Sequence, residues 1–191
     1  MRVTGGVLKG RFLKAPLGST TRPSTDKVRK ATFDLLFGLI DLHGARILDL
    51  FAGTGAMGIE AVSRGAESVV FVDSNLSALR PIKENLKLLS TIGNVGHVEV
   101  VKADILDKSG WGWLTSSNVV DDKSRNLFDL VFCDPPYAFD AWEILLCRLE
   151  DSLSASMAVL ESRSTFSISS SWRLSKQKRY GDTLLSIVVP A

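Results

Sequence analysis

Residues that build metal sites and disulfide frameworks are scarce in this sequence: two of its 191 residues are cysteine and two are histidine. Cys133 and Cys147 lie in apolar patterns, so we expect buried thiols in a reducing cytoplasm. His43 and His97 are far apart along the chain and have no Cys or His beside them, which argues against a metal site. This scarcity excludes disulfide-rich secreted proteins and zinc modules.

Long apolar runs are also missing. No run approaches the ~20 residues that cross a bilayer, and residues 1–6 lack the apolar segment of a signal peptide. With 45% hydrophobic and 23% charged residues, the composition is ordinary for a globular chain long enough to bury a core. We therefore expect one main domain with a small appendage, acting as a monomer in the cytoplasm without a membrane partner.

Positive charge is concentrated at the two ends of the chain, although the net charge is only +2. Residues 1–30 contain eight Lys and Arg against one acid, a net of +7, and residues 163–191 contain five against one, a net of +4. Residues 31–162 contain ten against nineteen, a net of −9. Because Lys and Arg neutralise phosphates, the basic ends suggest contact with a polyanion; a basic surface that is merely solvated is the alternative.

Strand-like and helix-like patterns alternate through most of the chain. Short apolar runs predict strands at 46–50, 68–72, 97–102, 128–133 and 157–160. Helical spacing of apolar residues predicts helices from about 24 to 44 and near 56–64, 75–89 and 139–149. Pro81 must either kink its helix or sit in its first turn. The alternation predicts an α/β fold, a mostly parallel sheet doubly wound by helices.

The segments outside this alternation are two predicted hairpins and one predicted loop. Residues 2–14 are glycine-rich and predict a hairpin, and residues 175–189 predict a second one. The polar stretch 107–126 predicts a long loop, in which Trp111 and Trp113 pack against the sheet more readily than they stack on a base. We divide the chain into a basic hairpin extension, residues 1–23, and a main domain, residues 24–191.

Four acidic residues mark the ends of predicted strands: Asp49, Asp73, Asp104 and Asp134. Ligands of parallel sheets bind at the carboxyl ends of the strands. Four acids on one rim are hard to explain as core design, because buried carboxylates need partners. The four acids therefore predict a crevice for a ligand that is rich in amines and hydroxyls.

A glycine-rich turn follows the first predicted strand of the sheet. The pattern Gly53-x-Gly55-x-x-Gly58 fits the dinucleotide fingerprint, and an acid, Asp73, follows the next strand. The glycines let the backbone approach a ligand closely, and Asp73 would hold ribose hydroxyls. By itself the turn fits a nicotinamide cofactor and S-adenosylmethionine equally well, and a tight turn without a ligand is a third interpretation.

The most informative stretch is Asp134-Pro135-Pro136-Tyr137, which follows a buried apolar strand. Two prolines lack backbone N–H donors and hold the chain extended, so a carboxylate and free carbonyls are fixed beside an aromatic ring. Such a corner can grip a planar amine: Asp134 and the Pro135 carbonyl accept its two N–H bonds, and Tyr137 covers the ring. A plain Pro-Pro turn that ends a strand is the alternative.

Together these motifs resemble the class I S-adenosylmethionine-dependent methyltransferases. More narrowly, the chain resembles the bacterial family that methylates the exocyclic N2 amine of a guanine in 16S ribosomal RNA. The resemblance covers nearly the whole chain and rests on Arg2-Val3-x-Gly5-Gly6 with Lys9-Gly10-Arg11, Arg22-Pro23-x-Thr25-Asp26-x-Val28-Arg29, the turn of residues 49–58, the corner of residues 134–137, and Lys178-Arg179-Tyr180-Gly181-x-Thr183. It implies a seven-stranded, Rossmann-like sheet.

The resemblance also implies a role for each matching residue. The S-adenosylmethionine site would comprise Asp49, Phe51, Ala52, Gly53, Thr54, Gly55, Asp73, Ser74, Asp104 and Ile105. Asp134, Pro135, Pro136 and Tyr137 would hold the guanine. Ribosomal RNA, in the small subunit or its assembly intermediate, would be held by Arg2, Lys9, Arg11, Arg22, Arg29, Lys178, Arg179 and Tyr180. No metal is implied.

Three other functions fit parts of the pattern. A methyltransferase of the same fold that acts on DNA adenine or on a protein glutamine amide would use the same corner. A cofactor-free RNA-binding assembly factor would need only the basic ends. A nicotinamide enzyme fits the glycine-rich turn, but it has no need for the proline-stiffened amine clamp at Asp134.

Overall fold

A computed structural model describes residues 1–15, 23–91, 97–115, 128–136, 138–153 and 155–191. The helices are α1 (Pro23–Leu36), α2 (Ala56–Ser63), α3 (Leu76–Leu86), the short 3-10 helix η1 (Leu89–Thr91), α4 (Lys108–Thr115) and α5 (Trp142–Leu153). The strands are β1 (Arg46–Leu50), β2 (Ser68–Asp73), β3 (Val98–Lys102), β4 (Leu130–Cys133), β5 (Ala158–Ser162), β6 (Trp172–Tyr180) and β7 (Thr183–Pro190).

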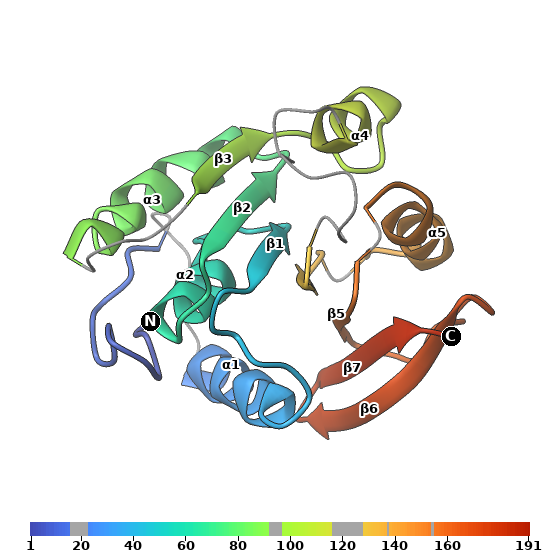
Figure 1. The fold of residues 1–191 in the computed structure, drawn as a ribbon, viewed down its shortest axis with the longest axis horizontal. Coiled ribbons are helices and arrows are strands. Elements are labelled where there is room, and N and C mark those ends of the chain that lie inside the picture. Colours follow the sequence, from blue (N-terminus) through green and yellow to red (C-terminus); the bar gives the residue numbers. More distant parts are fainter. Residues whose placement is uncertain (16–22, 92–96, 116–127, 137, 154) are drawn as a thin grey trace.

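The seven strands form one sheet in the order β3-β2-β1-β4-β5-β7-β6 (Figure 1). The first five strands pair in parallel, and β7 joins β5 and β6 antiparallel. The predicted α/β fold with a mostly parallel sheet is therefore confirmed. The chain order reverses between β1 and β4, which places the usual ligand crevice of such folds at their carboxyl ends.

Helices cover both faces of the sheet, α1, α2 and α3 on one and α4 and α5 on the other (Figure 1). Strand β1 shows why: Ile47 belongs to the core beneath the first group, whereas Leu48 and Leu50 belong to the core beneath the second. Successive side chains of a strand point to opposite faces, so a strand covered on both sides must be apolar throughout. This requirement explains the continuous apolar runs in the sequence.

Two predicted helices differ in detail from the structure. Helix α1 ends at Leu36 rather than near Gly44, because the chain turns at Gly38, whose φ of 82° is left-handed. Pro81 lies inside α3, in its second turn, because the helix begins at Leu76. Leu39 and Ile40 continue the apolar spacing beyond α1, which is why the sequence pattern extended the helix too far.

The polar stretch 107–126 is not entirely a loop. Its first part forms α4, and only residues 116–127 lie outside the described residues. Trp111 of α4 is buried in the core beneath α4 and α5, as the packing interpretation predicted. The side chain of Trp113 is outside the described set. A helix of eight residues that contains two glycines has too little helical pattern to stand out in a sequence.

The N-terminal segment, residues 1–14, folds onto the main domain. Arg2 and Phe12 form an isolated antiparallel bridge, so the predicted hairpin is present as one short pairing rather than two full strands. Val3, Leu8 and Leu13 are buried in the core beneath α1, α2 and α3. The segment therefore contributes to the same hydrophobic core as the sheet.

Two expected absences and the expected burial of the two cysteines can be compared with the structure. Within those ranges no helix is long and apolar enough to cross a bilayer, and no group of three His, Cys, Asp or Glu side chains could hold a metal ion. Cys133 is buried, and burial raises the pKa of its thiol well above the usual range. Cys147 is exposed, so its predicted burial is wrong: it lies on the outer side of α5.

Candidate active site at the carboxyl ends of the strands

A pocket of about 360 Å³ opens where β1 and β4 end, at the reversal of strand order. Its walls come from the N-terminus, α1, the turn after β1, the ends of β4 and β5, and the turn between β6 and β7. The sequence-predicted residues Asp49, Phe51–Thr54, Asp134 and Tyr180 all line it. Tertiary structure thus brings the glycine-rich turn, the acidic corner and the basic C-terminal hairpin to one place.

The glycine-rich turn has a left-handed backbone at three of its residues. The φ angles are 57° at Phe51, 54° at Gly53 and 74° at Gly55. Left-handed geometry is cheap for glycine but unfavourable for a bulky aromatic, so the surrounding structure must hold Phe51 in place. The Ala52 N–H donates to the Val72 carbonyl at 3.0 Å, and the Phe51 ring meets Phe139 edge-on at 5.3 Å. Strain of this kind is typical of ligand-binding turns.

Gly58 and Asp49 fix the turn against the sheet. A β-carbon at Gly58 would lie 2.4 Å from the Phe71 ring, so only glycine lets α2 pack this closely on β2. The Gly58 N–H donates to Asp49 Oδ2 at 2.9 Å. Asp49 is 3% exposed, and burial is the main cause that raises the pKa of its carboxyl from 3.8 to about 8. The carboxyl group therefore keeps its proton to a much higher pH than an exposed aspartate does.

This raised pKa predicts a pH dependence of stability. The folded state holds a proton at Asp49 that the unfolded state releases above pH ~3.8, so the carboxyl group stabilises the fold fully below that pH and progressively less up to about pH 8. We expect Asp49→Asn to remove a slope of up to about 1.4 kcal/mol per pH unit. Denaturant unfolding between pH 5 and 8 measures it. The exposed Asp140→Asn should keep the wild-type slope; an unchanged slope in Asp49→Asn would refute a protonated Asp49.

Asp73 connects the glycine-rich turn with the loop after β2. Its Oδ2 accepts the Gly53 N–H and its Oδ1 accepts the Asn75 N–H, each at 2.8 Å. The side chain is half-buried and the neighbouring Ser74 is exposed. Each carboxylate oxygen has further lone pairs, so Asp73 can hold the turn and still accept hydroxyl hydrogens.

Asp104 lies apart from the pocket. It is exposed, and with Gly110 it lines a second hollow of about 780 Å³ between the end of β3 and the start of α4. Its Oδ1 accepts the Leu106 N–H at 2.9 Å, while Ile105 is buried in the core. The two hollows share no wall residue, so the four predicted acids lie on one rim but not in one pocket.

The acidic corner lies between the pocket and a smaller hollow of about 40 Å³. Asp134 lines both, and Pro135 and Pro136 line the smaller one. Asp134 is open to solvent on one side, but loss of hydration on the other sides, followed by the charges of Glu161 and Asp49, raises the pKa of its carboxyl. Tyr137 falls outside the described residues. Phe139 packs edge-on against Trp142 at 4.9 Å, and both rings line the smaller hollow together with the corner residues.

Glu161 was missed by sequence reasoning. It follows Leu160 in β5, lines both the pocket and the smaller hollow, and has a raised carboxyl pKa caused mainly by burial. An acid that closes an apolar strand is the same signal that identified Asp134. No recognisable motif surrounds Glu161, and this is why the signal was passed over.

The C-terminal hairpin closes the pocket opposite the glycine-rich turn. Tyr180, Gly181, Asp182 and Thr183 line the pocket, and the Lys178 ammonium lies 5.5 Å from the centre of the Tyr180 ring. Lys178 and Arg179 are exposed along β6, the edge strand of the sheet. The predicted basic motif therefore stands at the mouth of the pocket.

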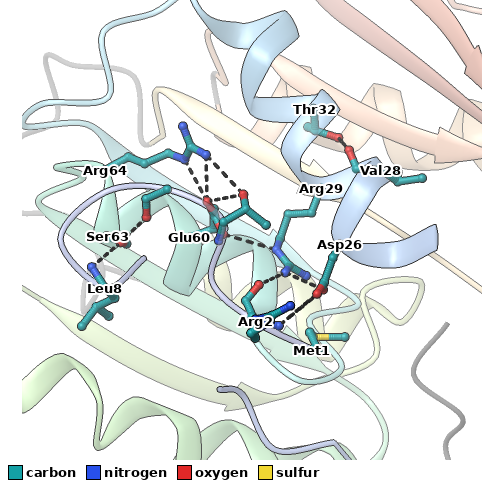
Figure 2. A network of polar contacts seen from close by, with 12 residues as sticks. Met1, Arg2, Leu8, Asp26, Val28, Arg29, Thr32, Glu60, Ser63 and Arg64 are labelled. Carbon is teal, nitrogen blue, oxygen red and sulfur yellow. Dashed lines mark hydrogen bonds and ion pairs between the residues drawn. The ribbon is translucent and has the colours of Figure 1, made fainter. Parts of the chain in front are cut away.

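Figure 2 shows a buried polar network that binds the N-terminal segment to α1 and α2. Glu60 of α2 is fully buried and its two oxygens accept the Thr4 N–H and hydroxyl, both at 2.7 Å. The Arg64 guanidinium donates to it at 2.8 Å and the Arg29 guanidinium at 3.3 Å. Ser63 accepts the Leu8 N–H at 2.9 Å. One buried carboxylate thus organises three segments.

Arg29 is not available to a phosphate, contrary to the sequence-based prediction. Its side chain is 3% exposed and donates to Asp26 at 2.8 Å, to Glu60 and to the Arg2 carbonyl. Its charge is satisfied within the protein, so the structure argues against the predicted contact between Arg29 and RNA. Arg2, Lys9 and Arg11 are exposed, and Arg22 lies outside the described residues.

Asn85 of α3 links the N-terminal segment directly to the glycine-rich turn. Its amide nitrogen donates to the carbonyls of Lys14 and Thr54, both at 2.9 Å, and its oxygen accepts the Lys14 N–H at 2.7 Å. Asn85 is 2% exposed, so these bonds are shielded from water. The N-terminal segment is therefore linked to the glycine-rich turn through the hydrogen bonds of Asn85.

Comparison with known proteins agrees with this geometry. The sequence model of a family described as conserved hypothetical protein 95 matches residues 1–189. A Bacillus subtilis protein with the name "Putative rRNA methyltransferase YlbH" is 38% identical over 151 residues, 79% of this chain and 74% of its own. An Escherichia coli K12 protein named ribosomal RNA small subunit methyltransferase D is 32% identical over 152 residues, 80% of this chain and 68% of its own.

Solved structures share the fold over the whole chain. A hypothetical protein of Thermus thermophilus superposes with a TM-score of 0.75 at 28% identity, covering 100% of this chain and 99% of its own. The magnesium protoporphyrin IX methyltransferase of Synechocystis PCC 6803, solved with bound S-adenosylmethionine, has a TM-score of 0.64 at 12% identity and covers 91% of this chain and 87% of its own. The latter likeness concerns the fold alone.

Proposed function

The chain belongs to the conserved hypothetical protein 95 family, and we propose that it transfers a methyl group from S-adenosylmethionine to the exocyclic N2 amine of a guanine in small-subunit ribosomal RNA. The observation that carries this proposal is the shared pocket of the glycine-rich turn and the Asp134 corner. We propose 16S ribosomal RNA, in the subunit or its assembly intermediate, as the partner, a monomer as the acting form, and the cytoplasm as the location.

The polar groups in and beside the pocket suit S-adenosylmethionine. Gly53 and Gly55 have no side chain to block a ligand's approach to the backbone of the turn, and Asp73, which accepts the Gly53 N–H beside the pocket, has acceptor capacity left for ribose hydroxyls. Asp49 and the N-terminal end of α2 lie beside the turn. Bound S-adenosylmethionine would supply a methyl group attached to a sulfonium sulfur, which leaves readily as a neutral thioether. We propose roles for Phe51, Ala52 and Thr54 as walls of this site.

The residues of the Asp134 corner then have to activate the guanine amine, which is a poor nucleophile. The lone pair of a guanine N2 amine is delocalised into the ring. Hydrogen bonds from the two amine protons to Asp134 and the Pro135 carbonyl favour a tetrahedral nitrogen whose lone pair is free, and fixed placement supplies much of the rest. The negative charge of Asp134 stabilises the positive charge that develops on nitrogen, and Asp134 or water then accepts the proton.

The basic surfaces at the pocket mouth account for RNA binding. Lys178 and Arg179 are exposed on the edge strand that leads into the pocket, and Arg2, Lys9 and Arg11 are exposed on the N-terminal segment, whose Met1 lines the pocket. Contacts to phosphates hold the RNA in position without reading its sequence. The target base has to be unstacked to enter the pocket, as in RNA loops and bulges.

Charge reversal at the hairpin tests this surface. We expect Lys178→Glu with Arg179→Glu to weaken RNA binding and to reduce the slope of log affinity against log salt by about one for each phosphate that the variant no longer neutralises. Filter binding or fluorescence titration at several salt concentrations measures the slope. Lys83→Glu with Lys87→Glu makes the same change of charge in α3 and just after it, near the opposite edge of the sheet, and should leave the slope unchanged. If the two variants had the same slope of log affinity against log salt, the RNA would bind to a surface other than the C-terminal hairpin.

The rival substrates are separated by one labelling experiment. The protein is incubated with S-adenosylmethionine carrying a labelled methyl group and, separately, with small ribosomal subunits from cells lacking the gene, duplex DNA, and a release factor. We expect label in ribosomal RNA, as N2-methylguanine by mass mapping. Label found only in DNA or protein would refute the proposal and favour the rival methyltransferase. If calorimetry detected no binding of S-adenosylmethionine, a cofactor-free assembly factor would be favoured.

A further inference from the structure

Glu161 stands beside Asp134 at the carboxyl end of the sheet. Cys133, the last residue of β4, pairs with Leu160 of β5 in parallel register, and the residues that follow these two are Asp134 and Glu161. Neighbouring strands are about 4.8 Å apart, and register partners on parallel strands point to the same face. Both side chains line the 360 Å³ pocket and the smaller hollow.

Nothing in the fold requires a carboxylate at this position. Glu161 is partly buried, and the one side-chain hydrogen bond that the described residues give it comes from the Thr183 hydroxyl, at a long 3.3 Å to Oε1. No Lys or Arg forms an ion pair with it in the described ranges. Placing two like charges side by side in a partly dry pocket destabilises the protein unless a ligand supplies hydrogen-bond donors.

On the basis of the proposed function, we propose that Glu161 accepts the N1–H of the target guanine and, together with Asp134, selects guanine over adenine. The Watson–Crick edge of guanine presents N1–H and the N2 amine as adjacent donors, which two neighbouring carboxylates can accept. Adenine presents an amine beside N1, which is itself an acceptor. An acceptor facing the second carboxylate would be left unpaired and repelled.

The raised pKa of each carboxyl sets a condition on this arrangement: the guanine donors must hold both groups ionised, because a protonated Glu161 would itself be a donor. Loss of hydration is the main cause at both residues, and the Glu161 charge is the next cause at Asp134. Two adjacent donors from one base would favour the ionised pair and so relieve the repulsion on binding. A site for adenine would instead need one donor and one acceptor.

A base analogue tests the inference without altering the amine. In 2-aminopurine the N2 amine is kept, but N1 carries no hydrogen and is an acceptor. Synthetic RNA of the mapped target loop is made with guanine or 2-aminopurine at the target position. We expect the wild-type protein to prefer guanine by about 100-fold or more in kcat/KM. Glu161→Gln, whose amide can donate to N1, should reduce this preference to less than about tenfold.

The outcomes separate this inference from the proposed function. No methylation of the guanine RNA by the wild-type protein would refute the proposed function itself. Methylation of guanine with the same preference in Glu161→Gln would refute only the role of Glu161. A large loss of S-adenosylmethionine affinity in Glu161→Gln, measured by calorimetry, would assign Glu161 to the cofactor and also overturn the inference.

Two further variants guard against a folding artefact. Glu161→Met keeps the length of the side chain but removes both acceptors, so it should lose guanine methylation and keep the weak reaction on 2-aminopurine. Glu150→Gln makes the same chemical change at an exposed position of α5 that lines neither hollow, and it should keep the wild-type preference for guanine. Loss of that preference in Glu150→Gln would mean that the total charge of the protein, rather than the position of Glu161, selects the base.

Discussion

Replacing Asp134 with alanine is expected to lower kcat by about 10²–10³-fold and to leave the affinity for S-adenosylmethionine nearly unchanged. The variant removes the acceptor for the guanine amine and the charge that stabilises the reacting nitrogen. The glycine-rich turn keeps its own supports, since its N–H groups donate to Asp73 and to the Val72 carbonyl. Single-turnover kinetics on small ribosomal subunits and calorimetry with the cofactor measure the two effects.

The pH profile and two variants sharpen this test. Asp134 has a raised carboxyl pKa, so the wild-type rate should rise with pH as the group loses its proton. Asp134→Asn keeps one acceptor oxygen, and we expect it to lose the charge effect and the corresponding pH dependence. The exposed Asp140→Ala should behave as wild type. Equal losses of cofactor affinity and rate in Asp134→Ala would argue against an amine-holding role.

Replacing Glu60 with alanine is expected to lower the free energy of unfolding by about 3–5 kcal/mol. The variant leaves the buried guanidinium of Arg29 without one of its two carboxylate partners, and it leaves the Thr4 N–H and hydroxyl without an acceptor. Breaking a buried ion pair costs more than the pair contributes, because the remaining charge stays desolvated. Denaturant unfolding followed by circular dichroism measures the change.

A surface pair provides the matched control for Glu60. Asp34→Ala removes the exposed ion pair with Lys30 in α1 and should change the free energy of unfolding by less than about 0.5 kcal/mol. If Glu60→Ala lowered the free energy of unfolding no more than Asp34→Ala does, water would have to enter the variant and solvate Arg29. The N-terminal segment should also become sensitive to protease in Glu60→Ala, because Thr4 loses both of its bonds to α2.

The alternation of strands and helices was predictable from the sequence because burial on both faces forces each parallel strand to be apolar throughout. The Asp134 corner and the glycine-rich turn were predictable because proline and glycine restrict or free the backbone by themselves. Helix α4 was missed because it is short and contains two glycines, which are poor helix formers. The end of α1 was misplaced because Leu39 and Ile40 pack on the core without continuing the helix.

Charged residues were the least predictable part of the site. Arg29 lies in a basic segment and was therefore predicted to contact phosphate, but only the folded chain shows that it forms ion pairs with Glu60 and Asp26. Asp104 ends a strand as Asp134 does, yet it faces a different hollow. The sequence states the charge of a side chain, whereas its partners come from segments that meet only after folding.

What the amino-acid sequence determined by itself was the order of the elements and the two turns whose shape proline and glycine dictate, since these depend on local backbone freedom and burial. What only the tertiary structure decided was which charges meet. The pairing of β4 with β5 placed Glu161 beside Asp134, and the packing of residues 1–14 on α2 gave Glu60 its partners. Contacts between residues far apart in the chain depend on strand order and register, which no local pattern specifies.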